Sequence, residues 1–350
     1  MIDELQTILK DLILAPGVSG NEGPVADVVK HYLGKAGIPE REIGEDKLGN
    51  IWVKVGPQGD AKRLLVAHLD EIGLRVTSIR PDGYCHVVPI GGIDANLWEG
   101  SPVVVHTEAG PVHGCIATQS LHVTVRQGQG RRERLDVKDL VLDLGVPDAE
   151  AVAGLGVKLL DTVTWPKSFN VSKHGLAMAR SLDDRFGCAA LLALVDELKR
   201  ADLKEPVVLC WSVQEEVGLR GARQLPLFDS VEEVIAVDSF TVGHGPTDNR
   251  RFDGPRIGLG PVFRCWDSTI LVPDVRRRAV LDKAAGLGFN LQYGYMPGGN
   301  DASVFSQGET VPLAFGVCVQ YSHTQCERAA LPDINELTLF LAAWCATDCD

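Results

Sequence analysis

The strongest constraint on the fold is a change of pattern along the 350-residue chain. In residues 1–73 and 165–350, apolar runs of strand length alternate with amphipathic helix patterns, which predicts an α/β sheet covered by helices on both faces. Residues 74–164 instead contain short runs rich in Val, Ile and Thr, separated by Gly and Pro. Such spacing predicts a small barrel or sandwich. We therefore expect one α/β domain, built from both ends of the chain and interrupted by a β-rich insert.

Hydrophobic periodicity predicts the individual elements. Helices are expected at 3–14, 21–37, 183–200, 274–285 and 333–346, with a helical turn near 147–153 and a further helix after Glu216. Strands are expected at 50–55, 63–69, 207–211, 234–237 and 313–319. Asn21 is expected to cap the second helix, and Asp333 with Glu336 resembles a capping box at the last one.

Charge and cysteine content exclude several classes of protein. The chain has 34 basic and 47 acidic residues, a formal net charge of −13, which argues against nucleic acid or an anionic membrane as a partner. No run approaches the roughly 18 apolar residues of a membrane helix, and no basic and apolar leader opens the sequence. The nine cysteines form no C-x-x-C pair. We expect reduced thiols and a cytoplasmic location.

Polar residues that packing does not require occur at five places, all at the carboxyl ends of predicted strands or in the loops beyond them. They are His68 with Asp70 and Glu71, Asp183 with Asp184, Glu215 with Glu216, Asp238, and His323. Taken alone, His68 could be a satisfied strand-end histidine and Asp183 an ordinary helix cap. Adjacent carboxylates such as Glu215 and Glu216, however, repel each other unless cations compensate. Because open α/β sheets bind ligands at this edge, the five groups could converge there.

The types of side chain at these places favour a hydrolytic metal site. Imidazoles and carboxylates without a thiolate suit Zn²⁺, Co²⁺ or Mn²⁺ better than a structural cysteine-type zinc site. The ligands are too many for one tetrahedral ion, but they suit two ions about 3.5–4 Å apart with one bridging carboxylate. His68 and Asp70 share a strand face, so the carboxylate could hold the second imidazole nitrogen. Either Glu215 or Glu216 is then left as a general base.

Four segments carry a more specific signal when they are read together. They are AHLDEIG (67–73), LDDRFG (182–187), VQEEVGLRGA (213–222) and YSHT (321–324). In order and spacing they resemble the co-catalytic metallo-aminopeptidases of peptidase family M42, which include glutamyl, deblocking and tetrahedral aminopeptidases. The resemblance covers essentially the whole chain. It implies a zinc-exopeptidase-like mixed sheet sandwiched by helices, with 74–164 as a β-barrel-like dimerisation domain, and assembly as dimers or twelve-subunit particles.

The resemblance also implies roles for single residues. His68 and Asp238 would bind one divalent ion and Glu216 and His323 a second, with Asp183 as the bridge. The two ions per subunit would be Zn²⁺ or Co²⁺, and Mn²⁺ is compatible with the same ligands. The peptide bond after Asp183 is often cis in this family.

In the implied mechanism, Asp70 orients His68 and Glu215 acts as the general base. Glu215 would take a proton from a water that bridges the metals, and the hydroxide would attack the first peptide bond of a short peptide. A carboxylate-rich site also attracts the α-ammonium group of such a substrate. The family's Gly-rich substrate loop is matched by Gly298, Gly299, Asn300 and Asp301. Asn300 stands where Thr is more frequent.

Three alternatives stay open at this point. A related dinuclear amidohydrolase, such as a carboxypeptidase or a deacylase, would use the same ligands. An endoglucanase-type glycosidase would use paired carboxylates, but it needs no histidine ligands. A non-catalytic assembly protein would have no use for the ligand set. The sequence does not predict which N-terminal side chain is preferred.

Overall fold

The computed structural model describes residues 2–120, 122, 135–225, 231–242, 254–306 and 310–349. The chain divides into two compact units, each described by itself below. The first consists of Met1–Asp70, Ser168–Ser322 and Cys326–Asp350, and the second of Glu71–Lys167 and His323–Gln325. The predicted insert, 74–164, falls within the second unit.

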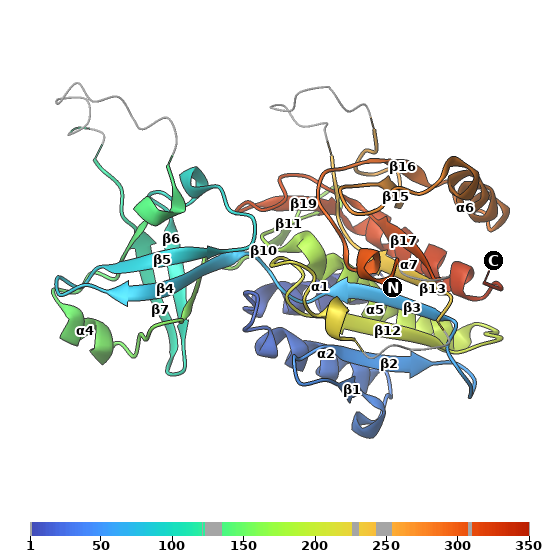
Figure 1. Ribbon diagram of the computed structural model, residues 1–350, viewed down its shortest axis with the longest axis horizontal. Helices are drawn as coiled ribbons and strands as arrows, with labels where there is room; N and C mark the ends of the chain where they lie inside the picture. Colours follow the sequence, from blue (N-terminus) through green and yellow to red (C-terminus); the bar gives the residue numbers. More distant parts are fainter. Residues whose placement is uncertain are drawn as a thin grey trace. The chain divides into compact units, whose positions relative to one another are not determined.

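The first unit is organised around an eight-stranded mixed sheet (Figure 1). In order across the sheet, the strands are β1 (Gly44–Glu45), β2 (Ile51–Val55), β12 (Val207–Ser212), β3 (Arg63–His68), β13 (Glu233–Val237), β17 (Val311–Gly316), β15 (Val262–Trp266) and β16 (Gln292–Tyr295). The central strands β12, β3, β13 and β17 are parallel to one another. β2 runs antiparallel to β12, and β15 antiparallel to β17. The predicted mixed α/β fold is therefore confirmed.

Helices supply most of the remaining core of this unit. They are α1 (Ile2–Leu14), α2 (Gly23–Lys35), α5 (Leu182–Arg200), α6 (Asp274–Gly286) and α7 (Leu331–Cys345), with single 3₁₀ turns η1 (Glu40–Glu42), η4 (Ala222–Gln224) and η5 (Asp301–Phe305). α5 packs against β3 and contacts α1, α2 and α7. Its apolar stripe is buried at the positions that the spacing predicts, including Phe186, Leu191 and Leu198. This packing fixes the first turn of α5 beside the end of β3.

Two small sheets complete the unit. β10 (Phe169–Val171), β11 (Leu176–Ala179) and β19 (Glu327–Ala330) form an antiparallel sheet, and β14 (Phe240–Thr241) pairs with β18 (Cys318–Val319). The strand predicted at 313–319 is thus split between β17 and β18. β15 and β16 were not predicted.

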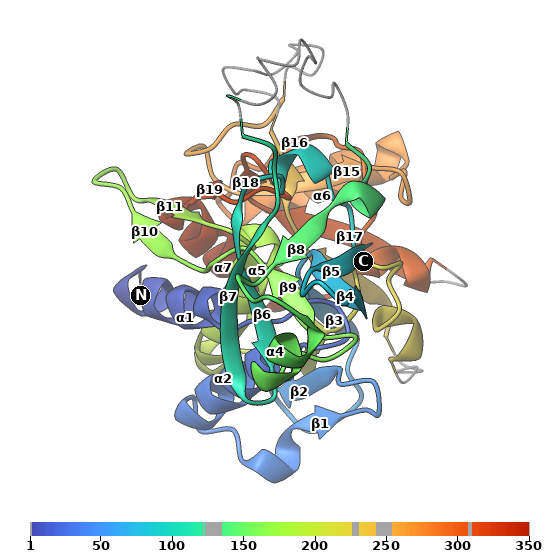
Figure 2. The ribbon, with the colours of Figure 1, turned by 90° about the vertical axis from the view of Figure 1, so that its left-hand side faces the viewer.

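The second unit is a closed antiparallel barrel (Figure 2). Around the barrel, the strands are β4 (Gly73–Ile79), β5 (Cys85–Ile90), β8 (Val141–Asp143), β7 (Gly110–Ile116), β6 (Pro102–Thr107) and β9 (Thr162–Thr164). Short connections are η2 (Ala95–Leu97), η3 (Val137–Asp139) and α4 (Ala149–Gly154). Trp98 and Trp165 stack in its core with ring centroids 3.8 Å apart. The barrel prediction is confirmed, and α4 corresponds to the predicted helical turn.

Three local predictions are wrong. The described residues after Glu216 form turns and the 3₁₀ turn η4 rather than an α-helix. Glu22, not Asn21, is the residue before α2. α7 begins at Leu331, and the Asp333 carboxylate accepts hydrogen bonds from the backbone N–H groups of Gly258 and Gly260 instead of capping its own helix.

Within the described residues, no helix is both long and apolar enough to span a membrane. All nine cysteines are free thiols, and most of them are buried.

Candidate active site

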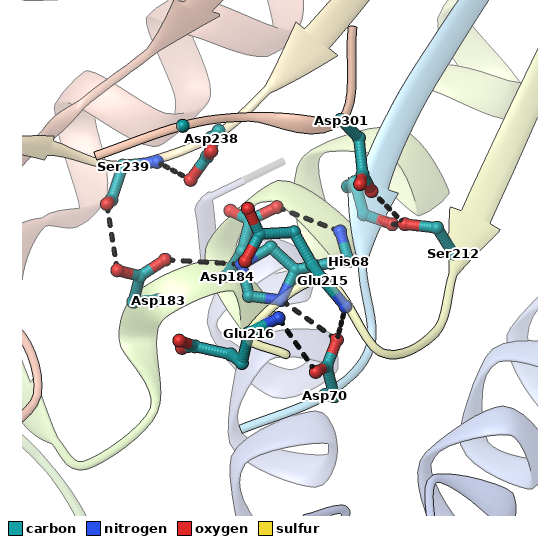
Figure 3. A network of polar contacts seen from close by, with 12 residues as sticks. His68, Asp70, Asp183, Asp184, Ser212, Glu215, Glu216, Asp238, Ser239 and Asp301 are labelled. Carbon is teal, nitrogen blue, oxygen red and sulfur yellow. Dashed lines mark hydrogen bonds and ion pairs between the residues drawn. The ribbon is translucent and has the colours of Figure 1, made fainter. Parts of the chain in front are cut away.

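The predicted site residues of the first unit meet at the carboxyl ends of its parallel strands (Figure 3). His68 is the last residue of β3, Asp238 directly follows β13, and Glu215 lies three residues beyond β12. Asp183 comes from the first turn of α5, where its backbone leaves helical geometry. The peptide bond between Asp183 and Asp184 is cis, as the family resemblance implies.

His68, Asp183 and Asp238 form a buried group that could hold a metal ion. One ligand atom from each side chain lies within 4.8 Å of the other two. The Nε2 atom of His68 is 3.4 Å from Oδ1 of Asp183 and 4.0 Å from Oε2 of Glu215. An imidazole nitrogen with carboxylate oxygens is a donor set that Zn²⁺ and similar divalent ions accept. The residues therefore fit the metal that the sequence pattern predicts.

Asp70 connects the histidine to the loop that carries Glu215. Its Oδ1 lies 3.4 Å from His68 Nδ1. The same carboxylate accepts hydrogen bonds from the Ser19 hydroxyl (2.6 Å) and from the backbone N–H groups of Glu215 (2.9 Å) and Glu216 (3.1 Å). Burial opposes its ionisation, but His68 and these donors outweigh that effect and lower the pKa of Asp70. A carboxylate fixed in this way orients an imidazole for metal binding.

Asp183 is held by three partners that the sequence analysis did not identify. The hydroxyls of Ser239 and Ser322 each donate to its Oδ2 at 2.9 Å, and its backbone N–H donates to Glu327 Oε2 at 3.1 Å. Oδ1 is thereby left facing His68. Ser239 and Ser322 each adjoin a predicted ligand in the sequence, which is a signal that could have found them. Glu327 gives no such local signal.

Asp238 is paired with a buried arginine, Arg264. Arg264 Nη1 donates to Asp238 Oδ2 at 3.2 Å, and its Nε lies 2.9 Å from Asp267 Oδ2. The guanidinium also donates to the carbonyl of Gly299 in the Gly-rich loop. Arg264 thus links a predicted ligand to the predicted substrate loop. The available signal was a single arginine inside the apolar run Val262–Trp266.

Carboxylates crowd this edge of the sheet, and their pKa values reflect it. Burial raises the pKa of Asp238 to about 6, although the Arg264 guanidinium lowers it. Burial also raises the pKa of Glu215 well above its ordinary value, with His68 opposing the shift and Asp238 adding to it. Burial likewise raises the pKa of Asp184. Burial lowers the pKa of His68, but Asp183, Asp70 and Glu215 together raise it well above the ordinary value. Clustered buried carboxylates of this kind favour a divalent cation among them.

The predicted substrate loop is anchored by its own side chains. Asn300 is buried, with its Nδ2 donating to Asp267 Oδ2 at 2.7 Å and its Oδ1 accepting from the N–H of Ala302. Asp301 accepts a short hydrogen bond from the Ser212 hydroxyl (Figure 3). Burial raises the pKa of Asp301 to about 7. The Asn300 side chain is therefore committed to holding the loop.

Two predicted ligands lie outside the three-residue group. Glu216 follows Glu215 in the same loop, and its backbone N–H donates a hydrogen bond to Asp70. His323 belongs to the second unit, where its Nδ1 lies 2.9 Å from the carbonyl oxygen of Gly92.

Comparison with known proteins identifies the family of this chain. The profile of the M42 glutamyl aminopeptidase family matches residues 49–339. The chain belongs to this family. It is 30% identical to the lysyl aminopeptidase of Pyrococcus furiosus, over 94% of this chain and 93% of that protein. It is 28% identical to the glutamyl aminopeptidase of Lactococcus lactis subsp. cremoris, over 97% and 95% of the two chains.

Solved structures give the same result for the fold. The TET1 peptidase of Pyrococcus horikoshii superposes with a TM-score of 0.88 at 31% identity, covering 99% of this chain and 100% of that one. With the family assignment and the aminopeptidase relatives, this M42 family member is a peptide-bond hydrolase.

Proposed function

We propose that this M42 family member is a dinuclear metal-dependent aminopeptidase that removes N-terminal residues from short peptides. The observation that carries the proposal is the approach of His68, Asp183 and Asp238 to within 4.8 Å of one another, with the Glu215 carboxylate 4.0 Å from His68. This arrangement combines a candidate ligand group with an adjacent acid that is not part of it, which is what general-base hydrolysis at a metal site requires.

His68 and Asp238 would hold one ion, Glu216 and His323 the other, and Asp183 would bridge them. The three-residue group supports the first ion and the bridge, whereas Glu216 and His323 rest on the family pattern. Two divalent ions would supply Lewis-acid polarisation of the scissile carbonyl and a lowered pKa of water. Zn²⁺ or Co²⁺ suits the ligands best, and Mn²⁺ is compatible with them.

Glu215 then acts as the general base. The carboxylate can accept a proton from water and, after attack, pass it to the departing amine. Asp70 contacts both the imidazole of His68 and the backbone N–H of Glu215, and it thereby holds the proposed ligand and the proposed base in fixed relative positions. The surplus of carboxylates attracts the free α-ammonium of a peptide, which favours cleavage at the N-terminus. Gly298, Gly299, Asn300 and Asp301 would form the substrate loop, in which the buried Asn300 side chain holds the backbone.

Self-association and cytoplasmic location belong to the same proposal. The P. horikoshii TET1 peptidase can assemble into a tetrahedron or a large octahedral shell. By analogy, this chain would form dimers through residues 74–164 and larger particles from those dimers. Nine free cysteines suit a reducing compartment.

The decisive test is a panel of aminoacyl-p-nitroanilides, each set against its N-acetylated counterpart. The enzyme is treated with a chelator, dialysed, and assayed after Zn²⁺, Co²⁺ or Mn²⁺ is added back. We expect activity to vanish on chelation, to return with one or more of the metals, and to require the free amino group. The metal content of the reactivated protein gives the number of ions per subunit.

Other outcomes would point to another function. Equal or faster hydrolysis of N-acylated substrates would indicate a deacylase, and release of C-terminal residues a carboxypeptidase. Cellulose cleavage that survives chelation would indicate a glycosidase. Protein purified without metal and inactive with every added metal would indicate an assembly role.

A further inference from the structure

A hollow lies in the first unit, along the loop that carries Glu215 but lined by other side chains. Its volume is about 610 Å³, and it is open to solvent. The β1–β2 turn contributes Asp46, Lys47 and Leu48, and the loop after β12 contributes Gln214, Arg220 and Arg223. None of these residues has a role in the proposed hydrolysis.

The charges in this hollow are unbalanced. Lys47, Arg220 and Arg223 are exposed, and none forms an ion pair with a residue that the structure describes. The carboxylate that lines the hollow, Asp46, is occupied elsewhere. It accepts hydrogen bonds from the backbone N–H groups of residues 48–50 and from the Asn50 side chain. The hollow is therefore lined by three cationic side chains and one carboxylate, in a chain whose formal net charge is −13.

The geometry of the lining residues suggests the chemistry of an occupant. Arg220 and Arg223 stand three residues apart on one short segment, and both line the hollow. The Nε of Arg223 also donates to the Gly218 carbonyl at 3.5 Å, which leaves its two Nη groups for an occupant. Guanidinium groups bind phosphate and carboxylate oxygens in pairs, and Lys47 adds a point charge from the opposite turn. The Gln214 side chain supplies a neutral amide donor. Leu48, which is 37% exposed, leaves apolar surface for a carbon skeleton.

We propose that this hollow binds a small multivalent oxyanion, either a phosphate or a polycarboxylate, through Arg220, Arg223 and Lys47. The occupant would tie the β1–β2 turn to the loop after β12. That loop is already closed on itself by the hydrogen bonds from Arg220 N to Gln214 O and from Gly221 N to Val213 O. Binding would therefore stabilise the folded protein against unfolding.

The test is isothermal titration of the full-length, metal-loaded protein with inorganic phosphate and, separately, with propane-1,2,3-tricarboxylate, at constant ionic strength. The double variant R220Q/R223Q keeps hydrogen-bonding side chains but removes both charges. R278Q is the matched control, because Arg278 is an exposed arginine of α6 outside the hollow. Metal content is measured for each protein to verify that the metal site, which could also bind an anion, is equally occupied in all three.

We expect a saturable one-to-one binding component, separate from any binding at the metal site, in the wild-type protein and in R278Q, and its affinity should be weakened at least about tenfold in R220Q/R223Q. Binding of phosphate alone would assign the site to phosphorylated ligands, and binding of both anions to oxyanions generally. Equal affinity in all three proteins would overturn the proposal. So would the absence of binding when each anion is present at a concentration on the order of 10 mM. Because no turnover is measured, the outcome is independent of the proposed peptidase mechanism.

Discussion

The two ends of strand β3 bury charged side chains in opposite ways. At its amino end, Arg63 pairs with Glu233 through Nε and Oε2 at 2.6 Å. The same guanidinium donates to the carbonyls of Cys345, Thr347 and Asp348, and Trp344 Nε1 donates to Glu233 at 2.8 Å. At its carboxyl end, His68 faces several carboxylates whose pKa values are raised by burial and mutual repulsion.

This difference separates structural charges from functional ones. In a buried pair that is also hydrogen-bonded, such as Arg63 with Glu233, the two charges compensate each other, so neither group needs a ligand. Buried carboxylates without enough cations destabilise the protein until a ligand compensates them. The charges at the amino end of β3 therefore stabilise the fold, whereas those at its carboxyl end are arranged to bind a ligand.

The largest effect is expected for Glu215→Gln. The amide keeps the size of the side chain but cannot accept a proton, so kcat should fall by about 10²–10⁴-fold. Metal content and folding should be unchanged, since Glu215 is not a proposed ligand. The matched control is E205Q, an exposed acid on the segment before β12. A kcat within a few-fold of wild type would remove Glu215 as the base.

At the other end of β3, Arg63→Met should damage stability rather than chemistry. Glu233 would be left buried without its partner, at a cost of about 3–5 kcal/mol in the free energy of unfolding. Urea unfolding measures this loss, and kcat per folded molecule should be unchanged. The double variant R63M/E233L, which removes both charges, should recover much of the stability. A loss of kcat without loss of stability would break the division between the two ends.

The metal-free protein should lose stability as the pH rises. Burial, with repulsion from Asp70, raises the pKa of Glu22 from 4.5 to about 7. The folded state therefore keeps a proton that the unfolded chain releases near pH 4.5. This contribution is fully present below pH 4.5, is lost as the pH rises through 7, and amounts to about 3 kcal/mol.

Urea unfolding of chelated protein at pH 5 and pH 8 measures this dependence. E22Q should make the dependence less steep, because the amide oxygen can still accept from Gly20 N and Gln214 N without titrating. The rest of the dependence comes from Asp238 and Asp301, whose pKa values are also raised by burial. The same pH dependence in E22Q and in wild type would show that Glu22 is not its source.

The sequence predicted the parts of this site that depend on local order, and it missed those that depend on distant partners. His68 and Asp238 were found because strand polarity places residues at strand ends on one edge, and Asp183 was found as an acidic residue at a predicted helix start. Arg264 was missed because nothing local shows that its guanidinium reaches Asp238. The helix expected after Glu216 was wrong for a similar reason. Hydrophobic periodicity carries no information about the hydrogen bonds from the backbone N–H groups of Glu215 and Glu216 to Asp70, which is far away in sequence.

The smallest effect is expected at Ser212, which lies beside His68 in the sheet register. Its hydroxyl donates to Asp301, whose pKa of about 7 is set mainly by burial and is lowered by this hydrogen bond. Ser212→Ala should therefore raise that pKa further and cost about 1–3 kcal/mol in unfolding free energy. The cost should be larger at pH 8 than at pH 5, because the ionised carboxylate needs the donor more than the neutral acid does.

Ser212→Thr keeps the hydroxyl and should lose less stability than Ser212→Ala at pH 8. A cost that is equal at both pH values would mean that Asp301 does not titrate in this range. It would then resemble the compensated charges at the amino end of β3. A cost that grows with pH would place Asp301 among the uncompensated carboxylates of the carboxyl end. The two variants therefore decide where the boundary between structural and functional charge lies along the sheet edge.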